Sequence, residues 1–446
     1  MRKIDFYLPE DSDYSIFYSI KDSIRFTMER TLVPYKGHLC SKSTFVDSEG
    51  ETMGWHDFGN LEGPGWAANA VGGAYEIYKF GQFTNDKRAQ NVALSILDHV
   101  LEDGFIDHES GFIICYRNVQ QDAFCLNYKH NNDWFCPGSM AKIGYQLLIF
   151  SDLVPDGQRR ERMREIAART ARWIDKYVVL APNGWYPRRS QADGKPYELN
   201  GNGDKPDPQF DGSGDGLFVL QLMAELTRRG YLDYRSRVRE KVDVFMNRGG
   251  FFGSINHDTY DAHENVAYAV AFRVLRQAAN LLMDEHIRRF AYNVCLIGLD
   301  RFKMSEDRNG VATKGLLFME KSWDTAYLWE NAEAALAYIE AYGETREKQY
   351  LSDGLTILRA ISRHHHGKHG FLTEGVDWNN HVGKGNHFEG AEFGDIRYTE
   401  PFLNNQHIVE PTLEYLEKYA LKKTKGEKTE YYDFEGNRIC VIAYKC

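Results

Sequence analysis

The sequence predicts an all-α fold, an (α/α)6 toroid of six helical hairpins with long loops on one rim. The first observation is a repeat, in which five helical stretches end in Gly followed by a large apolar residue. These glycines are Gly104, Gly184, Gly250, Gly310 and Gly370. Glycine just past a helix adopts the left-handed conformation that ends it, and recurrence at roughly 60 to 80 residues indicates repeated supersecondary units.

The second observation is that two kinds of helix alternate along the chain. Six segments are apolar around most of their circumference, which is typical of helices buried on both sides. These are residues 63–80, 137–150, 212–226, 264–282, 323–342 and 404–420. The segments between them have a charged face, as in 87–103, 157–178 and 345–363. Six buried inner helices with amphipathic outer helices between them predict a closed ring.

The C-terminal residues predict a small addition to this ring. We assign residues 1–422 to the toroid and residues 423–446 to a linker and a β-hairpin. KKTKGEK is basic and contains Gly, as linkers often do, and two β-prone stretches flank a Gly436-Asn437 turn. We expect this hairpin to pack on the outside of the toroid.

The composition limits the partners. A net charge of −10 argues against nucleic acid, because phosphate binding needs a basic surface. Aromatic residues make up 14% of the chain; most would fill the core, but some could stack on sugar rings in a cleft. No apolar stretch suits a membrane span or a signal peptide, so we expect a cytoplasmic protein with no membrane contact. The sequence does not indicate the oligomeric state.

No metal or other cofactor is expected. The seven cysteines are scattered, without a C-x-x-C pair. The histidine run from His364 to His369 follows an outer helix, where cationic side chains suit the helix dipole. The acidic run from Asn200 to Asp211 lacks the Gly and the closing Glu of a calcium-binding loop.

The repeated Gly-aromatic loop entries, together with the Trp- and Asp-rich starts of the inner helices, resemble the six-hairpin glycosidase-like superfamily over about residues 12–422. The resemblance implies carbohydrate chemistry, with an oligosaccharide as the partner. It specifies no reaction, because one fold supports many activities. In such a toroid the first turns of the inner helices and the long loops line one funnel.

Two carboxylates at the starts of inner helices are the candidate acid and base of a glycoside hydrolase. Asp215 lies in the Gly-rich sequence FDGSGDG, and Asp324 follows Trp323, whose ring suits a sugar subsite. If 323–342 is helical from its start, Trp323, Tyr327 and Glu330 share one face. The alternative is that the acids before these helices cap them.

A second reading is a lyase that removes the C5 proton of a uronate. The loop before residue 264 holds His257, Tyr260 and His263, which could act as base and acid in β-elimination. Asn132 and Trp134 resemble the Asn-Trp segment of toroidal lyases. The pattern is incomplete, and no Arg stands at a matching position.

The remaining candidates would bind substrate. Trp66, Trp185 and Trp378 lie at loop-to-inner-helix junctions or in rim loops, and Arg188 could pair with a sugar carboxylate. The long segment 375–401 is typical of a lid or binding loop, and we single out His387 and Arg397 there. The leading hypothesis is a glycoside hydrolase; a uronate lyase, a sugar epimerase or isomerase, and a non-catalytic glycan-binding toroid stay open.

Overall fold

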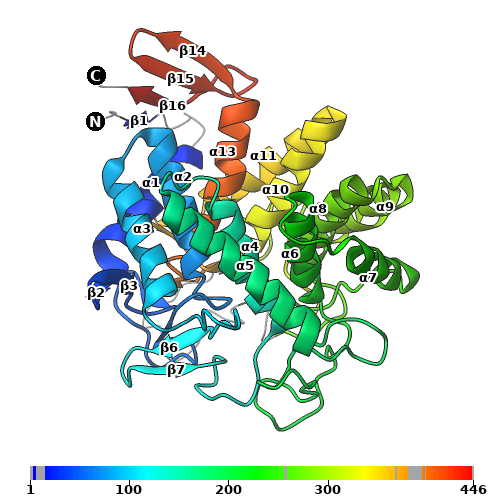
Figure 1. Cartoon of the computed structure of the whole chain (residues 1–446). Coiled ribbons are helices and arrows are strands. Elements are labelled where there is room, and N and C mark those ends of the chain that lie inside the picture. The colour runs from blue at the N-terminus through cyan, green and yellow to red at the C-terminus, as the bar shows by residue number, and fades with distance from the viewer. Residues whose placement is uncertain are drawn as a thin grey trace.

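The computed structural model describes residues 4–6, 16–255, 259–366, 369–379, 394–396 and 398–443. Helices dominate it (Figure 1). Their order and contacts define an inner and an outer layer. The inner layer consists of α2 (Ala70–Thr84), α4 (Pro137–Phe150), α6 (Gly216–Arg228), α8 (Asn265–Leu282), α10 (Leu328–Thr345) and the pair α12 (Asn404–His407) and α13 (Val409–Lys418). Each inner helix packs on the next and α13 packs on α2, so the ring closes.

The outer layer alternates with the inner one along the chain. It consists of α1 (Ile16–Phe26) with η1 (Thr27–Thr31), α3 (Lys87–Glu102), α5 (Gly157–Tyr177), α7 (Arg235–Asn247), α9 (Glu285–Phe290) with η2 (Ala291–Leu296) and η3 (Leu299–Phe302), and α11 (Lys348–Ser362). Almost every residue of inner helix α4 is buried, whereas α5 buries one face. The predicted (α/α)6 toroid is therefore confirmed.

The five repeat glycines lie in turns, but only Gly104 and Gly250 closely follow a helix. Gly184, Gly310 and Gly370 lie in loops well beyond helices that end at Tyr177, Phe302 and Ser362, so the prediction that a helix ends at each glycine was wrong for these three. All five have positive φ, from 80° at Gly310 to 116° at Gly104. An L-residue with a side chain rarely adopts this conformation, so glycine is required where each outer segment turns back toward the ring.

Three inner helices begin later than the apolar pattern suggested. Helix α2 begins at Ala70, α6 at Gly216 and α10 at Leu328. The prediction of a helix from residue 323 was wrong, because Thr325–Tyr327 forms strand β8, which pairs with β11 (Gly375–Asp377). Trp323 and Tyr327 therefore do not share a helix face.

The C-terminal residues form more strand than we expected. β15 (Lys428–Tyr432) and β16 (Arg438–Ala443) make the predicted hairpin. The stretch read as a linker contributes β14 (Leu421–Lys425), which pairs with β15, and β1 (Ile4–Phe6) pairs with β16. The resulting four-stranded sheet lies at one end of the molecule next to α13 (Figure 1).

Short strands join the loops that lead into the inner helices. They are β2 (Leu32–Tyr35) with β3 (His38–Ser41), β4 (Val46–Asp47) with β13 (Tyr398–Thr399), β5 (Leu61–Glu62) with β6 (Tyr116–Asn118) and β7 (Ala123–Cys125), β9 (His365–His366) with β10 (Phe371–Leu372), and β12 (Gly394–Asp395) with β11. In the described part of the chain, no helix is long and apolar enough to cross a membrane.

Candidate functional site

A cavity of about 210 Å³ lies where the inner helices begin. Its lining comes from residues before or at the starts of α2, α8, α10 and α12, and from the loop between β3 and β5. The described lining residues are Phe45, His56, Phe58, Trp66, Ala67, Thr259, Trp323, Tyr327, Trp329, Glu374, Tyr398, Glu400 and Leu403. This position at the helix N-termini is the funnel expected for a toroid.

Aromatic rings form much of the cavity wall. Trp66 and Trp329 meet edge to face, with ring centroids 5.7 Å apart, and Trp66 also packs edge to face on Phe218 of α6. Trp323 is half-buried at the same cavity. Rings fixed by such packing offer rigid apolar faces of the kind that stack on sugars.

Two buried glutamates bring carboxyl groups to the same cavity. Glu374 precedes β11, and its backbone N–H donates to Tyr398 O at 2.9 Å. This hydrogen bond holds the start of β11 beside β13, the strand that contains Tyr398. Glu400 precedes α12, and the Asn404 side-chain amide donates to its carboxylate. Burial raises the pKa of Tyr398 well above its ordinary value, and the neighbouring Glu374 carboxylate adds to this effect.

His56 is the histidine of the described cavity lining. The Phe58 backbone N–H donates to His56 Nδ1 at 3.2 Å, so this nitrogen acts as an acceptor. A neutral imidazole then has its proton on Nε2. The ring stays in place by packing on Phe45, 4.2 Å away between centroids.

Below the aromatic wall, charged side chains from the inner helices surround a second cavity of about 40 Å³. Its ionisable lining residues are Tyr75, Glu76, Lys142, Tyr145, Arg273, Glu333, His407 and Glu410. Burial lowers the pKa of Lys142 to about 8, against the raising effect of Glu333 and Glu76. Burial opposes ionisation of Glu333 too, but the charges of Arg273 and His407 hold its pKa below the ordinary value.

Asp215 is the N-cap residue of α6, yet its side chain makes no capping hydrogen bond. Capping therefore does not explain this aspartate. Ser213 Oγ donates to Asp215 Oδ2 at 3.2 Å, and burial raises the pKa of Asp215 to about 7, against the lowering effect of Arg188. Asp215 does not belong to the described cavity lining. Its catalytic role stays a prediction.

Asp324 is half-buried next to Trp323. Asn379 Nδ2 donates to Asp324 Oδ2 at 2.7 Å, which ties the start of β8 to the segment after β11. The side chain precedes a strand, so it caps no helix. It too lies outside the described cavity lining, and its catalytic role also stays a prediction.

The residues of the elimination hypothesis have separate partners. His263 Nδ1 lies 2.8 Å from the Tyr268 hydroxyl, and Tyr260 packs under the Arg188 guanidinium at 5.2 Å. Asn132 Oδ1 accepts the Leu126 N–H at 3.0 Å, which holds a loop. None of these three side chains lines the described part of the cavity.

The other predicted binding residues are mostly packed into the protein. Trp185 is fully buried, stacks on Phe251 at 4.7 Å, and donates from Nε1 to Ser213 O at 3.0 Å. Trp134 is buried beneath Arg189, 4.8 Å away. Trp66 and Trp323 are thus the two predicted tryptophans that line the cavity.

Arg188 and Trp378 are buried as well. Arg188 Nη1 donates to Thr259 O at 3.0 Å and lies 3.6 Å from Asp207 Oδ1, so it orders the loop before α8. Trp378 lies 5.3 Å from the Arg308 guanidinium, and its carbonyl accepts Asn309 Nδ2. His387, Arg397 and His257 lie outside the described residues.

Sequence reasoning missed several residues of this site. Glu374, His56 and Trp329 were not predicted, and neither was Glu400, which lies in the long segment 375–401. Glu400 stands just before the last inner helix, a position equivalent to those that drew attention to Asp215 and Asp324, and that signal could have selected it. Glu374 and His56 carry no such signal, because strand pairing and loop packing bring them to the cavity.

No protein-family model and no curated protein matches this sequence. Solved structures match over most of the chain. Cellobiose 2-epimerase from Bacillus thermoamylovorans is 14% identical, covers 90% of this chain and 99% of its own, and has a TM-score of 0.61. A sugar epimerase from a ruminal bacterium is 13% identical, with 91% and 98% coverage and a TM-score of 0.59.

A family 76 glycoside hydrolase from a bovine Bacteroides thetaiotaomicron strain is 11% identical, with 91% and 78% coverage and a TM-score of 0.54. At these identities the likeness concerns the fold alone. The neighbours have different reactions in their names but one architecture. The chain therefore has the six-hairpin, (α/α)6 toroid fold of these structures.

Proposed function

We propose that this protein is a glycoside hydrolase that binds a small oligosaccharide in the cavity at the start of the inner helices. The observation that carries the proposal is the combination of fixed tryptophan rings and two buried glutamate carboxyls around one cavity. Sugars have apolar ring faces and a polar edge, so they need both kinds of wall. The enzymes that share this fold act on carbohydrates by their names.

Glu374 and Glu400 are the proposed acid and base. Hydrolysis needs a carboxylic acid to protonate the departing glycosidic oxygen and a carboxylate to activate water or attack the sugar carbon. The acid gives its proton to the departing oxygen, which becomes a hydroxyl group. Water gives its hydroxyl to the sugar carbon and its other proton to the base. Asp215 and Asp324, which lie outside the described cavity lining, are the alternative candidates for acid and base.

A sugar epimerase or isomerase is the second candidate, and His56 favours it. These reactions move a proton at a carbon next to a sugar carbonyl, which needs a base and an acid on one substrate. His56 shares the cavity with Glu374 and Glu400. Sugar epimerases are also among the structures with this fold.

One product assay separates these reactions. The purified protein is incubated with a panel of neutral and uronate-containing oligosaccharides and with free disaccharides. New reducing ends without ultraviolet absorbance are expected for the hydrolase. Absorbance from a C4–C5 double bond would instead establish a lyase, and a changed sugar at constant reducing ends would establish an epimerase or isomerase. Glu374→Gln serves as the control for contaminating activity.

A further inference from the structure

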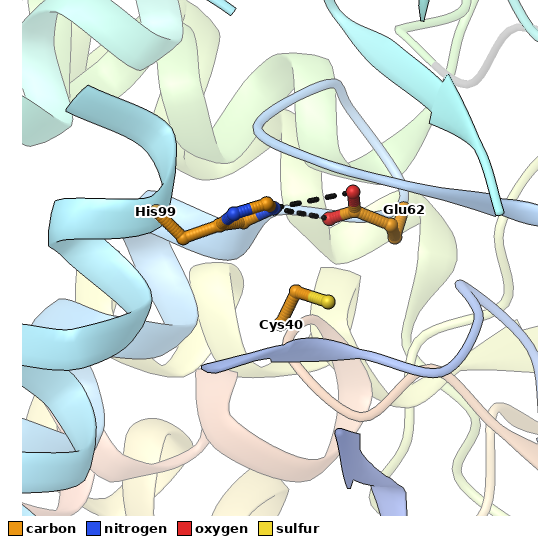
Figure 2. A group of neighbouring side chains, drawn as sticks. All are labelled: Cys40, Glu62 and His99. Atoms are coloured by element: carbon orange, nitrogen blue, oxygen red, sulfur yellow. Dashed lines mark hydrogen bonds and ion pairs between the residues drawn. The ribbon is translucent and has the colours of Figure 1, made fainter. Parts of the chain in front are cut away.

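A second cluster of reactive side chains, outside the described cavity lining, lies beside outer helix α3 (Figure 2). Cys40 comes from β3, Glu62 from β5 and His99 from α3, and each is at most 1% exposed. The cysteine sulfur, a carboxylate oxygen and an imidazole nitrogen all lie within 4.8 Å of one another. Among the described residues, this is the one group of three potential metal ligands so close together.

We propose that Cys40, Glu62 and His99 bind a divalent transition-metal ion, preferentially Zn²⁺, with a structural role. Thiolate, imidazole and carboxylate are the three side-chain ligands that zinc takes in proteins. A set that includes one sulfur and one imidazole also discriminates against Mg²⁺ and Ca²⁺, which prefer oxygen. This ligand set could not be expected from the sequence, because the three residues belong to no short spacing motif.

Each potential ligand also has a partner that orients it. Asp103 Oδ2 lies 2.7 Å from His99 Nδ1. The other ring nitrogen, Nε2, consequently faces Glu62, at 3.2 Å from both carboxylate oxygens (Figure 2). A carboxylate on the far nitrogen of a ligating histidine fixes its tautomer and raises its basicity, as is usual at zinc sites.

Arg117 contacts both Glu62 and Cys40. Its Nε donates to Glu62 Oε1 at 2.6 Å, and its Nη2 lies 3.7 Å from Cys40 Sγ. Asp122 accepts from Arg117 Nη1, and the Tyr35 ring packs on the guanidinium at 3.8 Å. The positive charge of Arg117 opposes a nearby cation, but the carboxylates of Glu62, Asp103 and Asp122 outnumber it.

The position of the cluster indicates what the ion would do. Cys40 and Glu62 lie at the two ends of residues 41–61, and this segment supplies Phe45, His56 and Phe58 to the cavity wall. An ion between them would close this loop and fasten both of its ends to α3 through His99. Closing a loop removes entropy from the unfolded chain, so metal binding would stabilise this wall. The inference does not depend on which reaction occurs in the cavity.

The test uses the full chain, stripped with a chelator and then loaded with Zn²⁺ or Co²⁺. We expect one zinc per chain after dialysis. X-ray absorption of the zinc form should show one sulfur at about 2.3 Å and imidazole nitrogen at about 2.0–2.1 Å. The cobalt form should show a sulfur-to-metal charge-transfer band. Limited proteolysis within residues 41–61 should be at least ~10-fold faster in the stripped protein than in the loaded one.

Cys40→Ala and Cys295→Ala are the matched variants, because Cys295 is also fully buried but lies on η2 outside the cluster. Zinc should be lost from Cys40→Ala and retained by Cys295→Ala. If Cys40→Ala does not fold, Glu62→Gln replaces it. The sulfur contribution to the X-ray absorption of the wild-type zinc form then still tests whether Cys40 binds the metal. Absence of bound zinc in the wild type, coordination without sulfur, or equal zinc in both cysteine variants would overturn the proposal and leave an ion-pair network around His99.

Discussion

Lys142 Nζ lies 4.0 Å from the centroid of the Trp66 ring. Trp66 lines the cavity at the start of the inner helices, and Lys142, on α4, lines the smaller charged cavity beneath it. The cation–π contact therefore joins the aromatic wall to the buried charges of the ring. It also places an ammonium group, with its pKa lowered by burial, against a ring proposed to stack on the sugar.

The Lys142→Met variant should differ from the wild type in how stability depends on pH. Burial lowers the pKa of Lys142 from 10.5 to about 8. Between these values the unfolded chain retains a proton that the folded chain has released, so Lys142 makes stability rise with pH there. The rise is about 3 kcal/mol at most. Urea unfolding of both proteins measures it, and a constant difference across this window would contradict the assignment.

Glu374→Gln and Glu400→Gln should each lower turnover by at least ~10²-fold, since an amide neither ionises nor donates an acidic proton. The matched control is Glu225→Gln. Glu225 is also buried, but it pairs with Arg228 and Arg229 at the other end of α6. This control should lose stability and keep its turnover per folded molecule. Near-normal turnover in both cavity variants would exclude Glu374 and Glu400 as the acid and base.

Asp215→Asn and Asp324→Asn test the pair predicted from the sequence. If either aspartate transfers protons, turnover should fall by at least ~10²-fold while sugar binding stays near normal. Asp215 is the better candidate for a general acid, because burial raises its pKa to about 7, close to neutral pH. Full activity of both variants, together with inactive cavity variants, would assign catalysis to the glutamates.

Trp66→Ala should weaken sugar binding by about tenfold or more, because it removes a ring face from the cavity. Trp185→Phe is the control, since this ring packs on Phe251 away from the described cavity lining. That control loses the hydrogen bond to Ser213 O and some buried packing volume, so it should lower stability without changing the cavity wall. Titration of intrinsic fluorescence measures binding in both variants. Equal affinities would show that the sugar does not stack on Trp66.

Much of the fold could be predicted because its signals are local. The left-handed glycines, such as Gly104 and Gly370, mark turns by backbone geometry alone. The all-round apolarity of α4 and the single apolar face of α5 distinguish inner from outer helices. Strand β14 was missed because its five residues are all exposed, so no alternation of apolar side chains marks it.

The candidate site was predictable only in part. Trp66 precedes α2 and Trp323 precedes β8, which leads into α10, and the closed ring brings these helix starts to one end, so position along the chain correctly suggested both. Trp134 and Trp185 occupy similar positions but point into packed aromatic clusters, a choice that depends on neighbours such as Tyr128 and Phe251.

The sequence by itself determined the ring, because helix periodicity and glycine turns repeat every hairpin and need no distant partner. The tertiary structure alone decided which side chains meet. Glu374 reaches the cavity through the pairing of β11 with β8, and Glu400 through the start of α12. Cys40, Glu62 and His99 come together from two strands and a helix. Such contacts join residues that are far apart in the sequence, so no local sequence pattern predicts them.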